Sequence, residues 1–96
     1  MSRPVEVTLL TQVDCTFCDA AKETLARVGS EYPLQLREVD LATPEGQRLG
    51  ASAGVLFAPG VLLDGVAFSY GRLSERKLRR ALARRGPVRD EQTRTT

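Results

Sequence analysis

Two cysteines, Cys15 and Cys18, are separated by two residues and are the only cysteines in this chain of 96 residues. Thiols exchange with disulfides through a mixed-disulfide intermediate, so a pair at this spacing can pass two electrons to a substrate and close into a disulfide. The chain has no histidine, which excludes Cys–His and Ser–His nucleophilic pairs and imidazole metal ligands. Two cysteines are too few for a four-ligand zinc site or a secreted disulfide framework. The sequence therefore favours reversible thiol–disulfide chemistry.

The cysteines lie where a predicted strand gives way to a predicted helix. Residues 4–10 alternate apolar and polar side chains, whereas beyond Cys15 apolar residues recur every three or four positions, the period of a helix. The free N–H groups at a helix start stabilise a thiolate, and residues three apart are neighbours on one turn. We therefore expect Cys15 to be the outward nucleophile and Cys18 the inward resolving cysteine. The apolar stripe of this helix consists of Phe17, Ala21, Leu25 and Val28.

Two carboxylates flank the cysteine pair. We predict that Asp14 is the N-cap of the helix and that Asp19 is an ordinary acid of its first turn, in preference to a role in proton transfer. Each carboxylate opposes ionisation of the neighbouring thiol, so thiolate formation at Cys15 must depend on the helix start. Gly29, directly after Val28, is predicted to be the C′ residue of the helix.

The rest of the chain continues the alternation of strands and helices. We predict a strand at 34–39, a helix from the N-cap Thr43 to near Gly54, strands at 61–63 and 66–70 joined by Asp64-Gly65, and a helix from the N-cap Ser74 to about Arg85. Val55, Leu56 and Phe57 are expected to approach the core before Pro59. The order β-α-β-α-β-β-α gives an α/β fold with a four-stranded mixed sheet and helices on both faces. We assign residues 1–86 to the domain and 87–96 to a disordered tail.

Four segments carry a resemblance to a known family. They are Leu9-Leu10-Thr11, Cys15-x-x-Cys18-Asp19-Ala20-Ala21, Ala58-Pro59-Gly60-Val61-Leu62-Leu63-Asp64-Gly65 and Gly71-Arg72-Leu73. Over about residues 4–85 the chain resembles the small bacterial glutaredoxin-like proteins of the thioredoxin superfamily. The resemblance implies a thioredoxin-like fold in which Pro59 is a cis-proline facing the cysteines and the backbone of Ala58 pairs with the substrate chain. Thr16 and Phe17, between the cysteines, are candidate substrate contacts, although the apolar stripe equally favours a partly buried Phe17.

The resemblance is incomplete at the positions that bind glutathione in glutaredoxins. Gln12 stands near the place of their lysine, Thr16-Phe17 replaces their Pro-Tyr, and only Gly71 represents their Gly-Gly-x-x-Asp segment. The Trp that precedes the cysteine pair in thioredoxins and the Gly-Pro that lies between their cysteines are absent here as well. These departures weaken the implication that the chain binds glutathione, which stays a candidate co-substrate. The sequence requires no metal or organic cofactor.

The net charge of +2 conceals a division of charge along the chain. Residues 1–71 carry five Arg or Lys against nine Asp or Glu, whereas residues 72–89 carry eight Arg or Lys against Glu75 alone. A basic helix can attract nucleic acid or an acidic protein. No aromatic residues interleave with its cations, so a solvated helix face is favoured over nucleic acid, and attraction of acidic protein partners stays open.

The leading hypothesis is a cytoplasmic thiol–disulfide oxidoreductase that reduces protein disulfides or mixed disulfides. Its partners would be disulfide-containing proteins and a thiol reductant system, either glutathione or a reductase-like protein. The N-terminus lacks a signal-peptide pattern, and no apolar run reaches the roughly 20 residues of a membrane span, so we expect neither secretion nor a membrane partner. Two alternatives stay open: a non-catalytic thioredoxin-fold interaction module that uses the basic helix, and an iron–sulfur cluster carrier bridging two chains.

Overall fold

The computed structural model describes residues 3–85 and confirms the predicted order of elements. The elements are β1 (Val5–Thr11), α1 (Thr16–Gly29), β2 (Leu34–Asp40), α2 (Pro44–Ala53), β3 (Gly60–Leu63), β4 (Val66–Tyr70) and α3 (Glu75–Arg85). The predicted bounds differ from these by at most one residue. The tail predicted at 87–96 lies outside the described residues. Within residues 3–85, no helix has the length and apolar character that crossing a bilayer requires.

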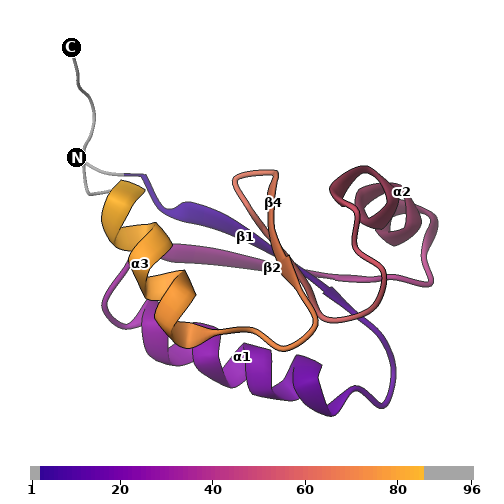
Figure 1. The fold of residues 1–96 in the computed structure, drawn as a ribbon, viewed down its shortest axis with the longest axis horizontal. Helices are drawn as coiled ribbons and strands as arrows, with labels where there is room; N and C mark the ends of the chain where they lie inside the picture. Colours follow the sequence, from indigo (N-terminus) through magenta and orange to yellow (C-terminus); the bar gives the residue numbers. More distant parts are fainter. Residues whose placement is uncertain (1–2, 86–96) are drawn as a thin grey trace.

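The four strands form one mixed sheet in the order β2-β1-β3-β4. β1 pairs in parallel with β2, from Val5 opposite Leu34 onward, and α1 makes the crossover between them (Figure 1). β3 runs antiparallel to β1, with Leu10 opposite Gly60. β3 therefore begins at the carboxyl end of β1, the end from which the chain continues to the cysteines.

The larger core lies between the sheet and the helices α1 and α3. Successive side chains of a strand point to opposite faces, and Val7 and Leu9 of β1 both point to this face, where they are fully buried. Burial of one such aliphatic side chain contributes about 1.5–3 kcal/mol. The helices contribute Ala21, Leu25, Val28, Leu78, Ala81 and Leu82 to the same core.

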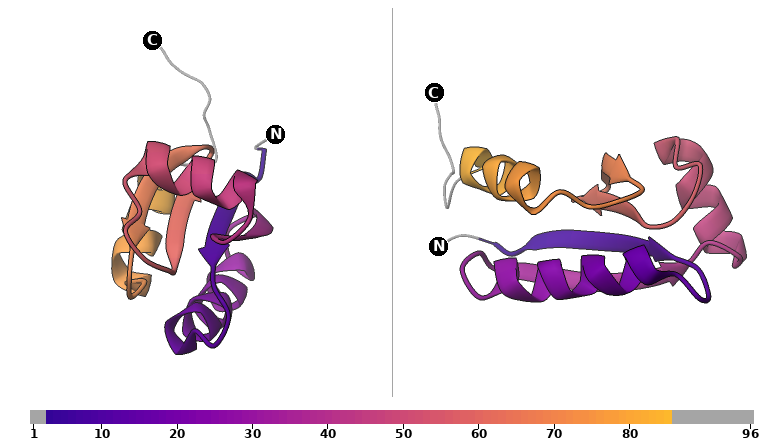
Figure 2. Two further views of the ribbon diagram at one scale, coloured as in Figure 1. Left: turned by 90° about the vertical axis from the view of Figure 1, so that its right-hand side faces the viewer. Right: turned by 60° about the horizontal axis from the view of Figure 1, so that its bottom comes forward.

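The opposite face of the sheet is covered by α2, as the end-on view shows (Figure 2). Leu10, Val39 and Leu62 are buried there, and Leu49 and Val55 pack against them. This second core is smaller and lies next to the carboxyl end of β1. Both faces of the sheet are thus covered by helices, as the α/β pattern predicts.

Local chemistry fixes several of the element ends as predicted. Thr43 caps α2, because its hydroxyl oxygen accepts the Gly46 N–H at 3.0 Å. The Ser74 hydroxyl oxygen accepts the Lys77 N–H at 3.2 Å at the start of α3. The turn between β3 and β4 has positive φ at both Asp64 and Gly65, which is the geometry of a tight hairpin.

The prediction that Gly29 is the C′ residue of α1 is wrong. Gly29 continues the helix, and Ser30 is the C-cap with right-handed backbone angles. The Ser30 N–H donates to the Arg27 carbonyl at 3.2 Å, and the Tyr32 N–H donates to the Val28 carbonyl at 2.9 Å. The last turn therefore closes without a left-handed residue, and a glycine is not required there.

Candidate redox site

Cys15 and Cys18 are joined by a disulfide just beyond the carboxyl end of β1, with their Cα atoms 5.2 Å apart. Cys15 is the N-cap of α1, with an extended backbone. Its Sγ accepts the backbone N–H of Cys18 at 3.1 Å, and its carbonyl accepts the N–H groups of Cys18 and Asp19. The helix start thus directs an N–H group at the sulfur of the residue predicted to be the nucleophile.

The two sulfur-bearing residues differ in burial. Cys18 is only 2% exposed, whereas Cys15 is half-buried. Thr16 and Phe17, between them, are both exposed. A disulfide partner in solution would therefore meet Cys15 before Cys18.

The prediction that Asp14 is the N-cap of α1 is wrong. Asp14 has a positive φ of 54° and is exposed, and the capping atom is the sulfur of Cys15. The turn of the chain at Asp14 places this residue before the helix, so Cys15 occupies the capping position. Asp19 lies in the first turn, as expected, where an acid complements the helix dipole.

Ala58 and Pro59 lie at the same end of the sheet as the disulfide. The peptide bond between them is cis, and both residues are buried. The next residue, Gly60, is opposite Leu10 in β1, so Pro59 is beside the end of β1. The Pro59 carbonyl accepts the Gly71 N–H at 2.8 Å, which ties this loop to the end of β4.

The prediction that Leu56 and Phe57 approach the core is wrong, although Val55 does pack there. Leu56 is 77% exposed and Phe57 is 55% exposed. Phe17 is likewise 50% exposed, and the buried side chains of α1 begin at Cys18 and continue with Ala21. The physical reason is position, because these residues lie beyond the end of β1, where no element of residues 3–85 covers them.

Aromatic contact holds Phe57 at this end of the molecule. Its ring meets the Tyr70 ring edge-on, with centroids 5.2 Å apart and planes at 89°, a favoured arrangement of aromatic pairs. Sequence reasoning missed Leu56, Tyr70 and the exposed Val13 as neighbours of the site. For Val13 and Leu56 the available signal was a large apolar residue in a loop, where polar residues are usual, whereas Tyr70 lies in β4 and gave no such signal.

Few charges are placed for recognition of an ionic ligand next to the disulfide. Asp14 and Asp19 flank the cysteines in sequence, and Lys22, one turn further along α1, pairs with Glu38 at 3.4 Å. Residues 3–85 contain no group of three or more cysteine or acidic side chains that gathers around a metal-sized space. The exposed Arg72 follows Gly71, whose N–H donates to the Pro59 carbonyl.

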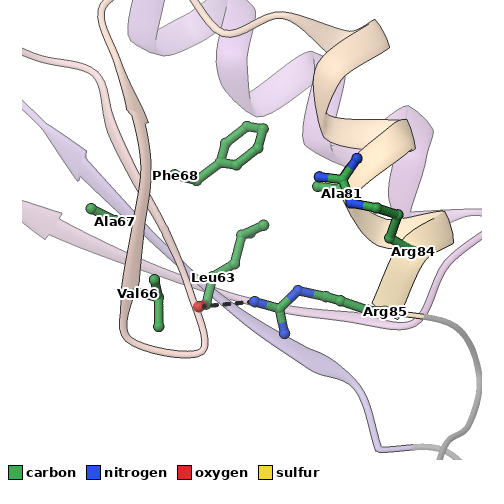
Figure 3. Close-up of a pocket in the computed structure, with 7 residues that line it drawn as sticks. All are labelled: Leu63, Val66, Ala67, Phe68, Ala81, Arg84 and Arg85. Carbon is green, nitrogen blue, oxygen red and sulfur yellow. Dashed lines mark hydrogen bonds between the residues drawn. The ribbon is translucent and has the colours of Figure 1, made fainter.

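A separate pocket of about 340 Å³ lies at the other end of the sheet. Its apolar floor includes Leu63, which pairs opposite Val7 near the start of β1. Arg84 and Arg85 of α3 line it as well, and the Arg85 guanidinium donates to the Leu63 carbonyl at 3.4 Å (Figure 3). Arg85 is also paired with Asp64 at 2.8 Å. This pocket does not adjoin the cysteines and is not part of the candidate redox site.

Known proteins share both the sequence pattern and the fold. The Glutaredoxin-like domain family (DUF836) matches residues 6–83. Uncharacterized proteins of Mycobacterium tuberculosis and Mycobacterium bovis are 40% identical over 87 residues, which cover 88% of this chain and 88% of each relative.

Among solved structures, the thioredoxin-like protein BC3987 has a TM-score of 0.62 at 26% identity, covering 79% of this chain and 99% of that one. A mutant thioredoxin from Halobacterium salinarum NRC-1 has a TM-score of 0.65 at 19% identity, covering 85% of this chain and 74% of its own. The fold, the disulfide and these likenesses together support a redox role for the Cys-x-x-Cys pair.

Proposed function

We propose a thiol–disulfide oxidoreductase function for this chain, which belongs to the glutaredoxin-like domain family (DUF836). The observation that carries the proposal is the asymmetric cysteine pair at the start of α1. Cys15 is the more exposed residue and its sulfur accepts a helical N–H, whereas Cys18 is buried one turn behind it. The substrates are protein disulfides or mixed disulfides.

The reaction has two exchange steps. The Cys15 thiolate attacks one sulfur of the substrate disulfide, a bond forms between these sulfurs, and the other substrate sulfur leaves as a thiolate. Cys18 then loses its proton and attacks Cys15 Sγ, which forms the intramolecular disulfide and releases the second substrate thiolate. The two substrate thiolates take up protons from water. The substrate gains two electrons, and the protein loses two.

The protein must then be reduced again by a thiol. A dithiol protein, or two molecules of glutathione, would return the two electrons by the same exchange in reverse. The residues of the chain supply the chemistry without a resident cofactor. The backbone N–H groups at the start of α1 stabilise the thiolate that leaves or attacks at Cys15.

Ala58 and Pro59 form the second wall of the proposed substrate site. They lie in the loop that enters β3 beside the end of β1, on the same side of the molecule as the start of α1. A substrate chain that presents its sulfur to Cys15 would pass along this loop. Thr16 and Phe17 border the sulfur on the helix side, where both are exposed.

Catalysed reduction of a protein disulfide tests the proposal. We expect the wild-type chain to accelerate reduction by a dithiol reductant, and both Cys15→Ser and Cys18→Ser to reduce this acceleration at least about tenfold, because the cycle uses both sulfurs. Ala83→Ser, at an exposed position of α3, is the matched control and should retain full activity. A wild-type protein that folds cooperatively yet performs no better than a variant lacking both cysteines would contradict the proposal and favour a non-catalytic interaction module.

A further inference from the structure

Large apolar side chains are exposed around the disulfide. Within residues 3–85, five of the seven exposed large apolar residues occur in the loop before α1, in its first turn, in the loop before Pro59 and at the end of β4, whereas Leu36 of β2 and Val66 at the start of β4 lie elsewhere. We call this group the apolar rim. Its members are Val13, Phe17, Leu56, Phe57 and Tyr70, which are 78%, 50%, 77%, 55% and 42% exposed. Clustered exposed apolar residues typically mark an interaction surface, whereas scattered ones need no explanation.

The part of the rim formed by the loop before Pro59 is held in place. Phe57 rests edge-on against Tyr70, and the Gly71 N–H donates to the Pro59 carbonyl. A Cβ atom at Gly71 would lie only 3.1 Å from the Phe57 ring, and Gly71 has a positive φ of 79°. The glycine therefore lets the ring settle against the backbone at this point. A side chain held in its binding position loses little entropy when a partner docks.

The position of the disulfide limits which ligands can contact the apolar rim. During exchange the substrate sulfur must lie against Cys15 Sγ, so the residues on either side of the substrate cysteine must pass over the adjacent loops. Glutathione offers these loops two carboxylates and no large apolar side chain. The acids Asp14 and Asp19 flank the cysteines in sequence and repel these carboxylates, and Arg72, which follows Gly71 at the Pro59 loop, is an exposed cation at this site.

We propose that Leu56 and Phe57, supported by Tyr70, are specificity-determining residues for polypeptide substrates with a large apolar side chain beside the reacting cysteine. This inference rests on the proposed oxidoreductase function and adds the class of substrate to it. An apolar substrate side chain would bury the exposed surface of Leu56 and Phe57 as the mixed disulfide forms. Because binding and attack occur together, the selectivity should appear in the rate of the first exchange step.

Three probes with one leaving group measure that step. They are a short peptide with phenylalanine next to its cysteine, the same peptide with serine in place of phenylalanine, and glutathione, each joined to thionitrobenzoate. Reduced protein is mixed with each probe, and release of thionitrobenzoate is followed by absorbance in a stopped-flow instrument. We expect the phenylalanine peptide to react about tenfold faster than the serine peptide and glutathione, a difference of about 1.4 kcal/mol.

Variants assign the selectivity to the rim. Leu56→Ser and Phe57→Ser should each remove most of the preference for the phenylalanine peptide and leave the rates with the other two probes within about twofold. Val66→Ser is the matched control, because Val66 is 64% exposed but lies at the far end of the sheet, in the pair with Leu63. It should leave all three rates unchanged, and thermal melting verifies that every variant is folded.

The outcomes separate the two claims. Equal rates with the two peptides, a preference for glutathione, or an equal loss on all three probes in the rim variants would overturn the inference and leave the oxidoreductase function standing. If the wild-type protein releases thionitrobenzoate no faster than Cys15→Ser does with any of the three probes, both the inference and the oxidoreductase function would be overturned.

Discussion

At the scale of single residues, Cys15 combines two roles that are usually given to different side chains. Its sulfur accepts the Cys18 N–H at 3.1 Å and so caps α1, and the same sulfur is the nucleophile of the proposed reaction. An oxygen-bearing side chain at this position would cap the helix as well but would not exchange with disulfides. The atom that caps the first turn of α1 is therefore also the proposed nucleophile.

Phe17 and Leu25 show how position on one helix separates function from stability. Both belong to the apolar stripe of α1, but Phe17 is 50% exposed and Leu25 is 3% exposed. We expect Phe17→Ser to change the free energy of unfolding by no more than about 0.5 kcal/mol, the usual limit for surface sites. Leu25→Ala should lower it by about 2–5 kcal/mol through the lost burial and the cavity.

Chemical denaturation of the two variants beside the wild type measures both changes. Tyrosine absorbance or far-UV circular dichroism supplies the signal, because the chain has no tryptophan. A loss of about 2 kcal/mol or more in Phe17→Ser would place this ring in the core and remove it from the apolar rim.

Residue types alone indicated the cysteine chemistry but not the exposure of the rim. The spacing of Cys15 and Cys18 and the lack of histidine favour thiol–disulfide chemistry. Exposure at Leu56 and Phe57 depends on which elements reach the end of β1, and no local pattern contains that information. The spacing rule therefore succeeded for Leu25, whereas for Phe17 it left burial and exposure open, and the structure shows this ring half exposed.

At the scale of elements, four side chains link the two helices that cover one face of the sheet. Arg27 of α1 donates to Glu75 of α3 at 2.9 Å, Glu75 accepts from Arg79 at 3.0 Å, and Arg79 pairs with Glu31 at 2.9 Å. Hydrogen bonds from Arg27 and Arg79 lower the pKa of Glu75 below its ordinary value of 4.5. Part of the basic charge of α3 is thus used within the fold.

This network predicts a pH-dependent contribution to stability. Because the pKa of Glu75 is lowered in the folded protein, its stabilising effect is fully present above about pH 4.5 and is lost as the pH falls through the lowered value. Glu75→Gln should reduce Tm at pH 7 by no more than a few degrees, since exposed pairs contribute little. The difference from wild type should disappear in strong acid.

Thermal melts between pH 2 and pH 7 test this prediction. Glu23→Gln is the control, because Glu23 is an exposed acid of α1 that forms no ion pair within residues 3–85. A Tm difference for Glu75→Gln that persists unchanged at the lowest pH would contradict the assigned role of the carboxylate.

Element ends were predictable where one residue type meets one geometric need. Thr43 and Ser74 cap helices because a hydroxyl can accept the N–H three residues ahead, and Asp64-Gly65 tolerates the two positive φ angles of a tight turn. The end of α1 was not predictable in this way, because Ser30 closes it with right-handed angles that many residues adopt. The start of α1 was missed at Asp14 for a related reason, since a cysteine sulfur rarely serves as a cap.

At the scale of the whole molecule, topology brings distant segments to one end of the sheet. The antiparallel pairing of β1 with β3 sets the start of β3 beside the exit from β1. The loop before Pro59 therefore lies at the same end as the start of α1, although about 40 residues separate them in the sequence. The order of elements predicted a parallel βαβ unit and an antiparallel hairpin in one mixed sheet, and the structure adds that β3 pairs with β1. The burial of each side chain depends on how the elements pack, and it was known only from the structure.

The basic helix is the feature of the whole molecule that the redox proposal leaves unused. Arg79 and Arg85 are paired within the fold, whereas Arg76, Lys77 and Arg80 are not paired with any of residues 3–85. The sequence suggests that these cations attract an acidic protein partner, and this stays a proposal.

The unequal reactivity of the two cysteines is the most direct test of the central claim. Reduced Cys18→Ser and Cys15→Ser proteins are each mixed with a disulfide-bonded peptide, quenched with acid, and assayed for the mixed disulfide by intact mass spectrometry. The proposed mechanism predicts that Cys18→Ser accumulates a stable adduct on Cys15, at a rate at least about tenfold above that of Cys15→Ser, since reactivity follows access and thiolate character. Equal rates in the two folded variants, or faster reaction at Cys18, would contradict it.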